Sequence, residues 1–146
     1  MARHNTFPIA SVAFAAGTSR ESVWEKITDF HGWPESMPRL HSVKLPNTEQ
    51  LGRGSVIVQQ WGAIEEEWQI DHWHPGQCLE LILQQSLRSI GIRFEISSGQ
   101  DPDQLQLRLE AECRCHGPFR IFQPLQLFLL NRKLKNRFSA FLRAIQ

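Results

Sequence analysis

The segment from Ile64 to His74 contains the residues best suited to acid–base chemistry. If this segment is a β-strand, alternate side chains share a face, and one face carries Ile64, Glu66, Trp68, Ile70 and His72. A carboxylate and an imidazole inside an apolar cavity could exchange protons with a substrate or orient a polar ligand. Glu66 could equally belong to a solvated acidic run, and a bulge near the strand end could turn His72 to the other face. Glu66 and His72 are therefore candidate acid and base residues, with both alternatives open.

Two cysteines and a histidine near the end of another expected strand raise the question of a metal site. Cys113 and Cys115 share one face of this strand, and His116 lies on the other. Structural zinc sites need four ligands, usually two separate pairs, and Cys78 is isolated. A nucleophilic cysteine would need a nearby base, which the spacing does not provide. We expect small buried thiols, no metal and no cofactor.

Composition excludes several other functions. The chain has no glycine-rich phosphate loop, HExxH or G-x-S-x-G motif. Its net charge of +1 gives no general reason to bind nucleic acid. Three scattered cysteines favour a reduced intracellular protein, and Met1–Pro8 lacks the apolar run of a signal peptide. The interrupted apolar stretch 119–130 is too short to span a bilayer, so we expect a soluble, cytoplasmic protein.

The pattern of apolar residues predicts one domain over residues 1–146, of the α+β class. A strand over 9–16 precedes a helical segment, and six further strand-length segments follow it at hairpin spacing. Alternation is clean over 87–97 and 103–116, which predicts an antiparallel sheet with one apolar face. A long helix from about Pro124 to Ala144 would cover that face. Its apolar stripe consists of Leu127, Leu130, Leu134, Phe138, Phe141 and Ile145.

The helical segment after the first strand is the most specific signal in the chain. Thr18 or Ser19 could cap a helix, which Gly32 could end, and Pro34 suits the first turn of a second short helix. Val23-Trp24, Asp29-Phe30 and Trp33-Pro34 match, in register, the pattern "VW..l.Df..wp...p".

This pattern resembles that of the START-like superfamily (SRPBCC), which includes polyketide cyclase/dehydrase, Bet v 1 and lipid-transfer proteins. The run Trp68-x-Ile70-x-x-Trp73-x-Pro75 is similar to a strand end common in its polyketide cyclase/dehydrase members. The resemblance implies a helix-grip fold, in which a curved antiparallel sheet of about seven strands wraps around a long C-terminal helix. Two short helices follow the first strand.

The resemblance also implies that a small hydrophobic molecule, such as a lipid, an isoprenoid or an aromatic polyketide-like compound, binds between the sheet and the C-terminal helix. We predict a non-catalytic binding or carrier protein, with a cyclase/aromatase-like enzyme or an interaction module as alternatives. The expected ligand-binding residues are Phe30, Trp33, Glu66, Trp68, Ile70, Ile92, Phe94, Leu107, Leu109, Cys113, Leu127, Leu130 and Leu134.

The segment 119–130 is apolar on more than one helix face, which exceeds what covering a sheet requires. Its surplus apolar residues could line the cavity mouth or pack on Phe119, Ile121 and Phe122 just before them. They could also form a homodimer contact, or touch a membrane surface together with the basic residues that follow.

Overall fold

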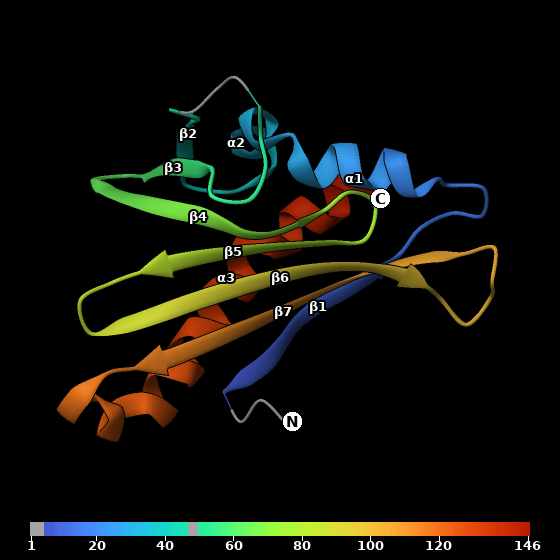
Figure 1. Cartoon of the computed structure of the whole chain (residues 1–146). Helices are drawn as coiled ribbons and strands as arrows, with labels where there is room; N and C mark the ends of the chain where they lie inside the picture. The colour runs from blue at the N-terminus through green and yellow to red at the C-terminus, as the bar shows by residue number, and fades with distance from the viewer. Residues whose placement is uncertain (1–4, 47–49) are drawn as a thin grey trace.

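The computed structural model describes residues 5–46 and 50–146, which form one curved antiparallel sheet and a set of helices (Figure 1). Residues 1–4, part of the segment used to predict the absence of a signal peptide, lie outside this range. The strands are β1 (Thr6–Ala13), β2 (Leu40–Lys44), β3 (Val56–Trp61), β4 (Ile64–His74), β5 (Cys78–Gln84), β6 (Arg88–Ser98) and β7 (Leu105–Cys115). The helices are α1 (Arg20–Thr28), η1 (Phe30–Gly32), α2 (Trp33–Ser36), η2 (Gly117–Phe122) and α3 (Gln123–Ile145).

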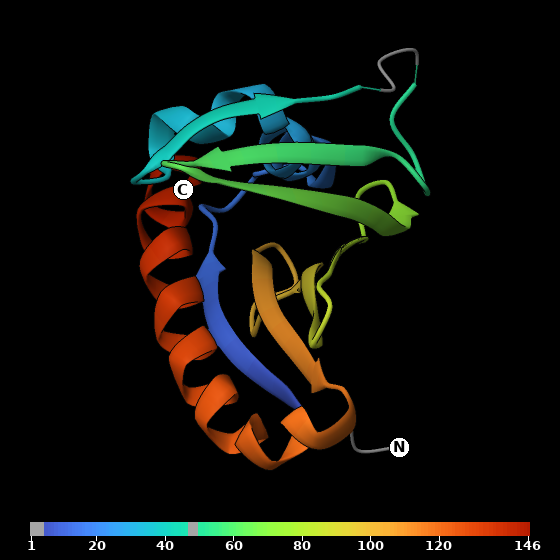
Figure 2. The same cartoon turned by 90° about the vertical axis from the view of Figure 1, so that its left-hand side faces the viewer.

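The strand order is β1-β7-β6-β5-β4-β3-β2, and neighbouring strands are antiparallel. Strands β2 to β7 therefore form a continuous meander, whereas β1 pairs with β7 at the far edge. The predicted helix-grip fold is confirmed: the sheet curves around α3, which crosses its concave face (Figure 2).

The first strand occupies 6–13 rather than the predicted 9–16. Proline has no backbone N–H for a strand ladder, so it is disfavoured in the middle of a sheet. Because β1 is an edge strand, it tolerates Pro8, and its pairing with β7 shifts between Pro8 and Ala10. The predicted alternation in β6 and β7 is confirmed, since their apolar side chains are buried on the concave face.

The short helices after β1 are confirmed, and Ser19 is the cap of α1. The Ser19 hydroxyl accepts a hydrogen bond of 3.1 Å from the backbone N–H of Ser22. Thr18 instead donates its hydroxyl to the carbonyl of Ala15, 2.7 Å away. The α1 helix ends at Thr28, and a turn of η1 leads directly into α2, which has Pro34 in its first turn.

Helix α3 has 23 residues and begins next to Pro124, as predicted. Its buried side chains are Leu130, Leu134, Phe138, Phe141, Leu142 and Ile145, so the predicted stripe is confirmed except for Leu127, which is only partly buried. This stripe packs on the concave face of the sheet and gives α3 its position.

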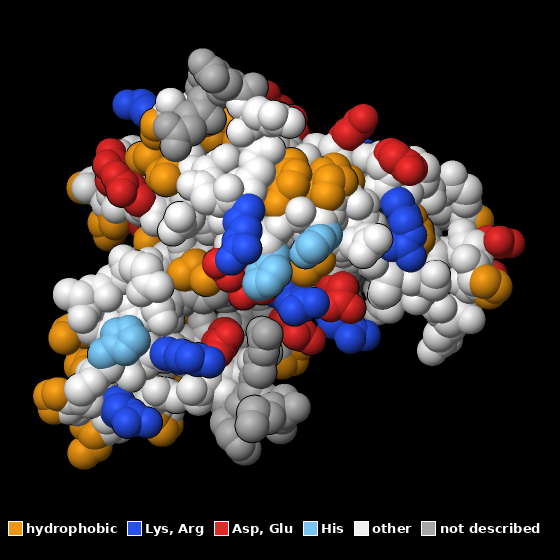
Figure 3. All heavy atoms as spheres, in the orientation of Figure 1, with side chains coloured by type: hydrophobic (Ala, Val, Ile, Leu, Met, Phe, Trp, Pro, Cys, Tyr) orange, Lys and Arg blue, Asp and Glu red, His pale blue; other side chains and the backbone are white. Residues whose placement is uncertain are grey.

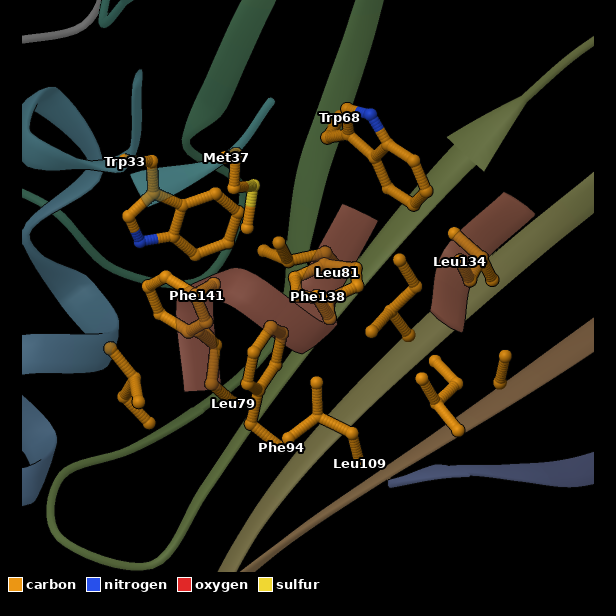
Figure 4. Close-up of a cluster of buried hydrophobic side chains, with 14 of the residues drawn as sticks. Trp33, Met37, Trp68, Leu79, Leu81, Phe94, Leu109, Leu134, Phe138 and Phe141 are labelled. Carbon is orange, nitrogen blue, oxygen red and sulfur yellow. The ribbon is translucent and has the colours of Figure 1, made fainter. Parts of the chain in front are cut away.

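An aromatic cluster fills the space between α3 and the sheet (Figure 4). The ring of Phe138 lies 5.7 Å from Phe94, 6.0 Å from Trp33 and 6.1 Å from Phe141, centroid to centroid. Edge-on contacts at these distances are favourable for aromatic rings. The void next to this cluster, bordered by Trp33, Trp68 and Phe138, has a volume of only about 10 Å³. That space holds about one water molecule, so no ligand-sized cavity lies there.

Candidate functional site

The cleft with the best combination of size, charge and apolar surface lies at the side of the concave face, between α3 and the strands β2 to β4. It has a volume of about 640 Å³. Its lining residues are Pro38, Arg39, His41, Trp61, Gly62, Ile64, Lys133, Asn136 and Arg137. Three elements that are distant in sequence thus meet around one opening: the approach to β2, the β3–β4 hairpin and the middle of α3. We call this space the cationic cleft.

A buried ion pair lies at the inner side of the cationic cleft. Arg137 donates to both carboxylate oxygens of Glu66, at 3.0 Å from Oε1 and 3.4 Å from Oε2. The indole Nε1 of Trp68 donates to Oε1 at 3.2 Å, and Lys133 Nζ lies 3.9 Å from Oε2. Glu66 is only 5% exposed, so these donors compensate for the loss of water around its charge.

Trp61 forms the aromatic side of the cleft, and its ring stacks on the guanidinium group of Arg137. The guanidinium carbon of Arg137 lies 3.7 Å from the centroid of the Trp61 ring, a close cation–π contact. Trp61 Nε1 in turn donates a 2.9 Å hydrogen bond to Gln59 Oε1. Arg137 is therefore held by an ion pair and by stacking at once, and its position is well defined.

Arg39 contributes a strained backbone to the rim of the cleft. With φ of 70°, it is the one non-glycine residue in the described ranges 5–46 and 50–146 with positive φ. Side chains with a Cβ rarely adopt this region, and such strain often occurs at functional sites. A second arginine with this backbone conformation thus lies beside the opening.

Positive charge exceeds negative charge among the residues that line the cleft, and the pKa of Lys133 is lowered. Partial burial lowers the pKa of the Lys133 amino group, the nearby Arg137 lowers it further, and Glu66 opposes the shift. Arg39, Lys133 and Arg137 line the cleft, and Glu66, which pairs with Lys133 and Arg137, is the carboxylate next to them. An anionic group entering the cleft would therefore meet favourable charge and would stabilise the protonated Lys133.

Comparisons with solved structures agree with this architecture. A START superfamily protein from Mycobacterium smegmatis has a TM-score of 0.58 and 18% identity, covering 92% of this chain and 97% of that one. Ara h 8.0201 has a TM-score of 0.64 and 10% identity, and the match covers 96% of each chain. The Zhui aromatase/cyclase from a Streptomyces species has a TM-score of 0.59 and 12% identity. The match covers 96% of this chain and 93% of that one.

The chain has the START-like fold. No family model matches the sequence, and no curated protein matches it either. The comparisons therefore support the predicted fold and leave the ligand or activity to be argued from the residues.

In this START-like fold, Glu66 and His72 do not share a face, which corrects the prediction from strand alternation. The pairing of β4 with β5 shifts between Ile70 and His72, so Asp71 is an extra residue and the alternation inverts. His72 then lies on the convex face, where its side chain is about half exposed, while Glu66 lies at the cleft. The two side chains therefore lie on opposite faces of β4, and their roles as acid and base stay a prediction.

The bulge brings His72 close to two carboxylates on the convex face. Its Nδ1 lies 3.3 Å from Asp71 Oδ2 and 3.2 Å from Glu80 Oε2. Side chains of both charges and histidines gather in the middle of this face (Figure 3). Asp71, His72 and Glu80 are close enough to act as ligands of a metal ion. The same two contacts are also expected for a surface histidine that pairs with acidic neighbours and binds no metal.

The residues predicted to bind ligand fall into two groups. Glu66 lies at the inner side of the cleft, and Trp68 contacts it through its indole N–H. The other predicted residues belong to the packed core or to its edge: Phe30, Trp33, Ile70, Ile92, Phe94, Leu107, Leu109, Cys113, Leu127, Leu130 and Leu134. The role of all these residues in binding stays a prediction, and the void that Trp33 and Ile92 border has a volume of only about 10 Å³.

Lys133 and Arg137 were not among the site residues predicted from the sequence, although both line the cleft. Arg137 lies three residues after Leu134 and four before Phe141, at the border of the apolar stripe. A glutamate expected on an apolar strand face requires a cation, so this border position was a usable signal. Arg39 had no such signal, because its role depends on a loop conformation.

The cysteines occupy the positions predicted for structural thiols. Cys113 and Cys115 are buried, and burial raises the pKa of the Cys113 thiol from 9.0 to about 11, with the neighbouring Cys115 adding to the shift. Burial also raises the pKa of Cys78. Raised pKa values disfavour the thiolate and hence nucleophilic chemistry.

The raised pKa of Cys113 predicts a loss of stability at alkaline pH. Between pH 9.0 and about 11, the unfolded chain releases the thiol proton while the folded chain keeps it. The contribution to the free energy of unfolding is thus complete below pH 9.0 and declines as the pH rises to about 11. Denaturant titrations of the wild type and of Cys113→Ala over this range should show a shallower decline for the variant. Parallel curves would contradict the prediction.

Proposed function

We propose that this protein binds a small hydrophobic molecule with an acidic group, and that the cationic cleft is the binding site. The supporting observation is the combination of Arg39, Lys133 and Arg137 with the apolar surfaces of Trp61 and Ile64 around one space of about 640 Å³. Clefts of this size with few placed polar groups are typical of small-molecule sites. The packed core favours this cleft over the interior predicted from the sequence.

The acidic group would lie near Lys133, because its amino group is 3.9 Å from Glu66 and is not held by a short hydrogen bond to that carboxylate. Arg137 is already engaged by Glu66 and Trp61, so we assign it the role of shaping the site. The apolar part of the ligand would rest against Trp61 and Ile64. A lipid-like or polyketide-like acid has both parts: a charged group for Lys133 and an apolar body for Trp61 and Ile64.

A cyclase-like activity has less support. The oxygens of Glu66 already accept hydrogen bonds from Arg137 and Trp68, which leaves this carboxylate poorly placed to take a substrate proton. The second proton-transfer candidate, His72, lies on the opposite face of β4. A cytoplasmic location likewise stays a prediction from the sequence.

The test compares dodecanoate with dodecanol, which have the same chain and differ in charge. Calorimetric titration should give tighter binding of dodecanoate, and Lys133→Gln should weaken it about tenfold, as expected for one charge-assisted hydrogen bond. Lys135→Gln is the matched control, because this exposed lysine lies on the same helix and does not line the cleft. Equal affinity for the two probes, or an equal effect of the two lysine variants, would refute the assignment.

A further inference from the structure

Five large apolar side chains are exposed where η2 joins α3. We call them the apolar ridge: Ile121, Phe122, Leu125, Phe128 and Leu129. Their exposed fractions range from 49% for Leu129 to 78% for Ile121. All five lie within nine consecutive positions, in contrast to the scattered apolar residues of an ordinary surface. Hydrophobic side chains are visible at this end of the molecule in Figure 3, at the lower left.

Packing of α3 does not account for the ridge. The helix already contacts the sheet through a separate stripe that begins at Leu130 and continues to Ile145. Leu125, Phe128 and Leu129 lie on the outward side instead, at helical spacings of three and four. The same spacing continues along this side to Arg132, Lys135 and Arg143, which are exposed. The outward side of α3 is therefore apolar at its beginning and basic beyond it.

The charge of the chain is divided sharply between its two parts. Residues 113–146 contain seven Lys and Arg and no Asp or Glu. Residues 1–112 contain nine Lys and Arg against fifteen Asp and Glu, so the net charge of +1 conceals two oppositely charged parts. A ridge of apolar side chains in a segment that carries cations and no acidic residue is complementary to an apolar layer with an anionic surface.

We propose that the apolar ridge inserts into the surface of an anionic lipid bilayer, with Arg120, Arg132 and Lys135 against the lipid headgroups. Phenylalanine and leucine side chains at the start of α3 would enter the boundary of the acyl chains. Each basic residue near an anionic surface adds attraction that salt screens. In the described part of the chain, no helix has the length and apolar character needed to cross a membrane. The ridge therefore lies on the bilayer.

A second copy of the chain fits this surface less well. A two-fold dimer through the apolar ridge would bring the same patch of each copy together. Arg120, Arg132 and Lys135 of one copy would then approach those of the other, and the segment 113–146 contains no acidic residue to compensate for them. Like charges facing each other oppose association.

Vesicle flotation tests the proposal with the full chain. The wild type should float with vesicles of phosphatidylcholine and phosphatidylglycerol, much less with phosphatidylcholine alone, and less again at high salt. The variant with Phe128→Gln and Leu129→Gln should bind at least tenfold more weakly. Its thermal unfolding should be unchanged, because both side chains are exposed. Arg132→Gln with Lys135→Gln should reduce only the binding that depends on the anionic lipid.

Two matched controls assign the effect to the apolar ridge. Ile64→Gln removes an equally exposed apolar side chain beside the cationic cleft, and Arg108→Gln removes an exposed cation on β7; both should float like the wild type. If Ile64→Gln loses binding as strongly as the ridge variant, lipid contacts the cleft and the proposal is wrong. Failure of the wild type to float with either vesicle also overturns it. A wild-type dimer in sedimentation that the ridge variant converts to a monomer would identify a second copy as the partner instead. None of these outcomes depends on the dodecanoate titration, so the two proposals can fail separately.

Discussion

Replacing Glu66 by glutamine is expected to lower the free energy of unfolding by about 3 kcal/mol, at the lower end of what losing one partner of a buried ion pair costs. The variant keeps the shape of the side chain but leaves Arg137 and Lys133 facing each other without an anion. Removing Arg137 as Arg137→Met should cost less, about 1–2 kcal/mol, because Lys133 can move closer to the remaining carboxylate. Denaturant titration measures both losses.

The neighbouring residue provides the control for this substitution. Glu67→Gln makes the same chemical change one position away, on an exposed side chain, and should change stability by less than about 0.5 kcal/mol. Combining Glu66→Gln with Arg137→Met should recover part of the loss, because the uncompensated guanidinium is then gone. Strict additivity of the two single effects would mean that Glu66 and Arg137 do not interact.

Replacing Phe138 by alanine is expected to cost about 4 kcal/mol, as for other buried phenylalanines that leave a cavity. Phe138 is 3% exposed and contacts Trp33, Phe94 and Phe141, so its removal leaves an apolar space at the centre of the cluster. Apolar cavities of this kind stay dry and accept small apolar molecules. Benzene should therefore raise the melting temperature of the variant but not that of the wild type.

Phe128→Ala on the same helix is the matched control, because Phe128 is exposed and its truncation should change stability by less than about 0.5 kcal/mol. A cost near 1 kcal/mol for Phe138→Ala would show that the neighbouring rings close the space. A wild type that is stabilised by benzene as strongly as the variant would contradict the description of a filled interior.

The fold could be predicted from the sequence because its signals are local. Alternation in β6 and β7 survives in the structure since both strands pair along their whole length without a shift. The Val23-Trp24 to Trp33-Pro34 pattern lies within α1, η1 and α2, where side-chain spacing directly follows the helical turn. The same local rules failed at His72. A single extra residue in the strand opposite Glu80 moves His72 to the other face of the sheet, and the amino-acid composition does not reveal such a bulge.

The site was harder to predict because it depends on contacts between distant elements. Glu66 was identified as a polar group on an inward face, but its partner lies 71 positions further along the chain. Whether the interior is hollow depends on how Trp33, Phe94 and Phe138 pack together, and the sequence specifies only that these residues are apolar. Arg39, at the rim of the cleft, has a left-handed backbone conformation, which the residue type arginine does not predict.

The position of β1 at the far edge of the sheet has a consequence for how the chain folds. Strands β2 to β7 each pair with the next strand along the chain, so their hairpins close short loops. Strand β1 pairs with β7, and Thr6 lies opposite Glu112. Closing that long loop costs more conformational entropy than closing a hairpin, and such long-range pairing slows folding. During synthesis, the N-terminal strand must therefore wait for nearly the whole domain to leave the ribosome before it finds its partner, so the first strand made is the last to join the sheet.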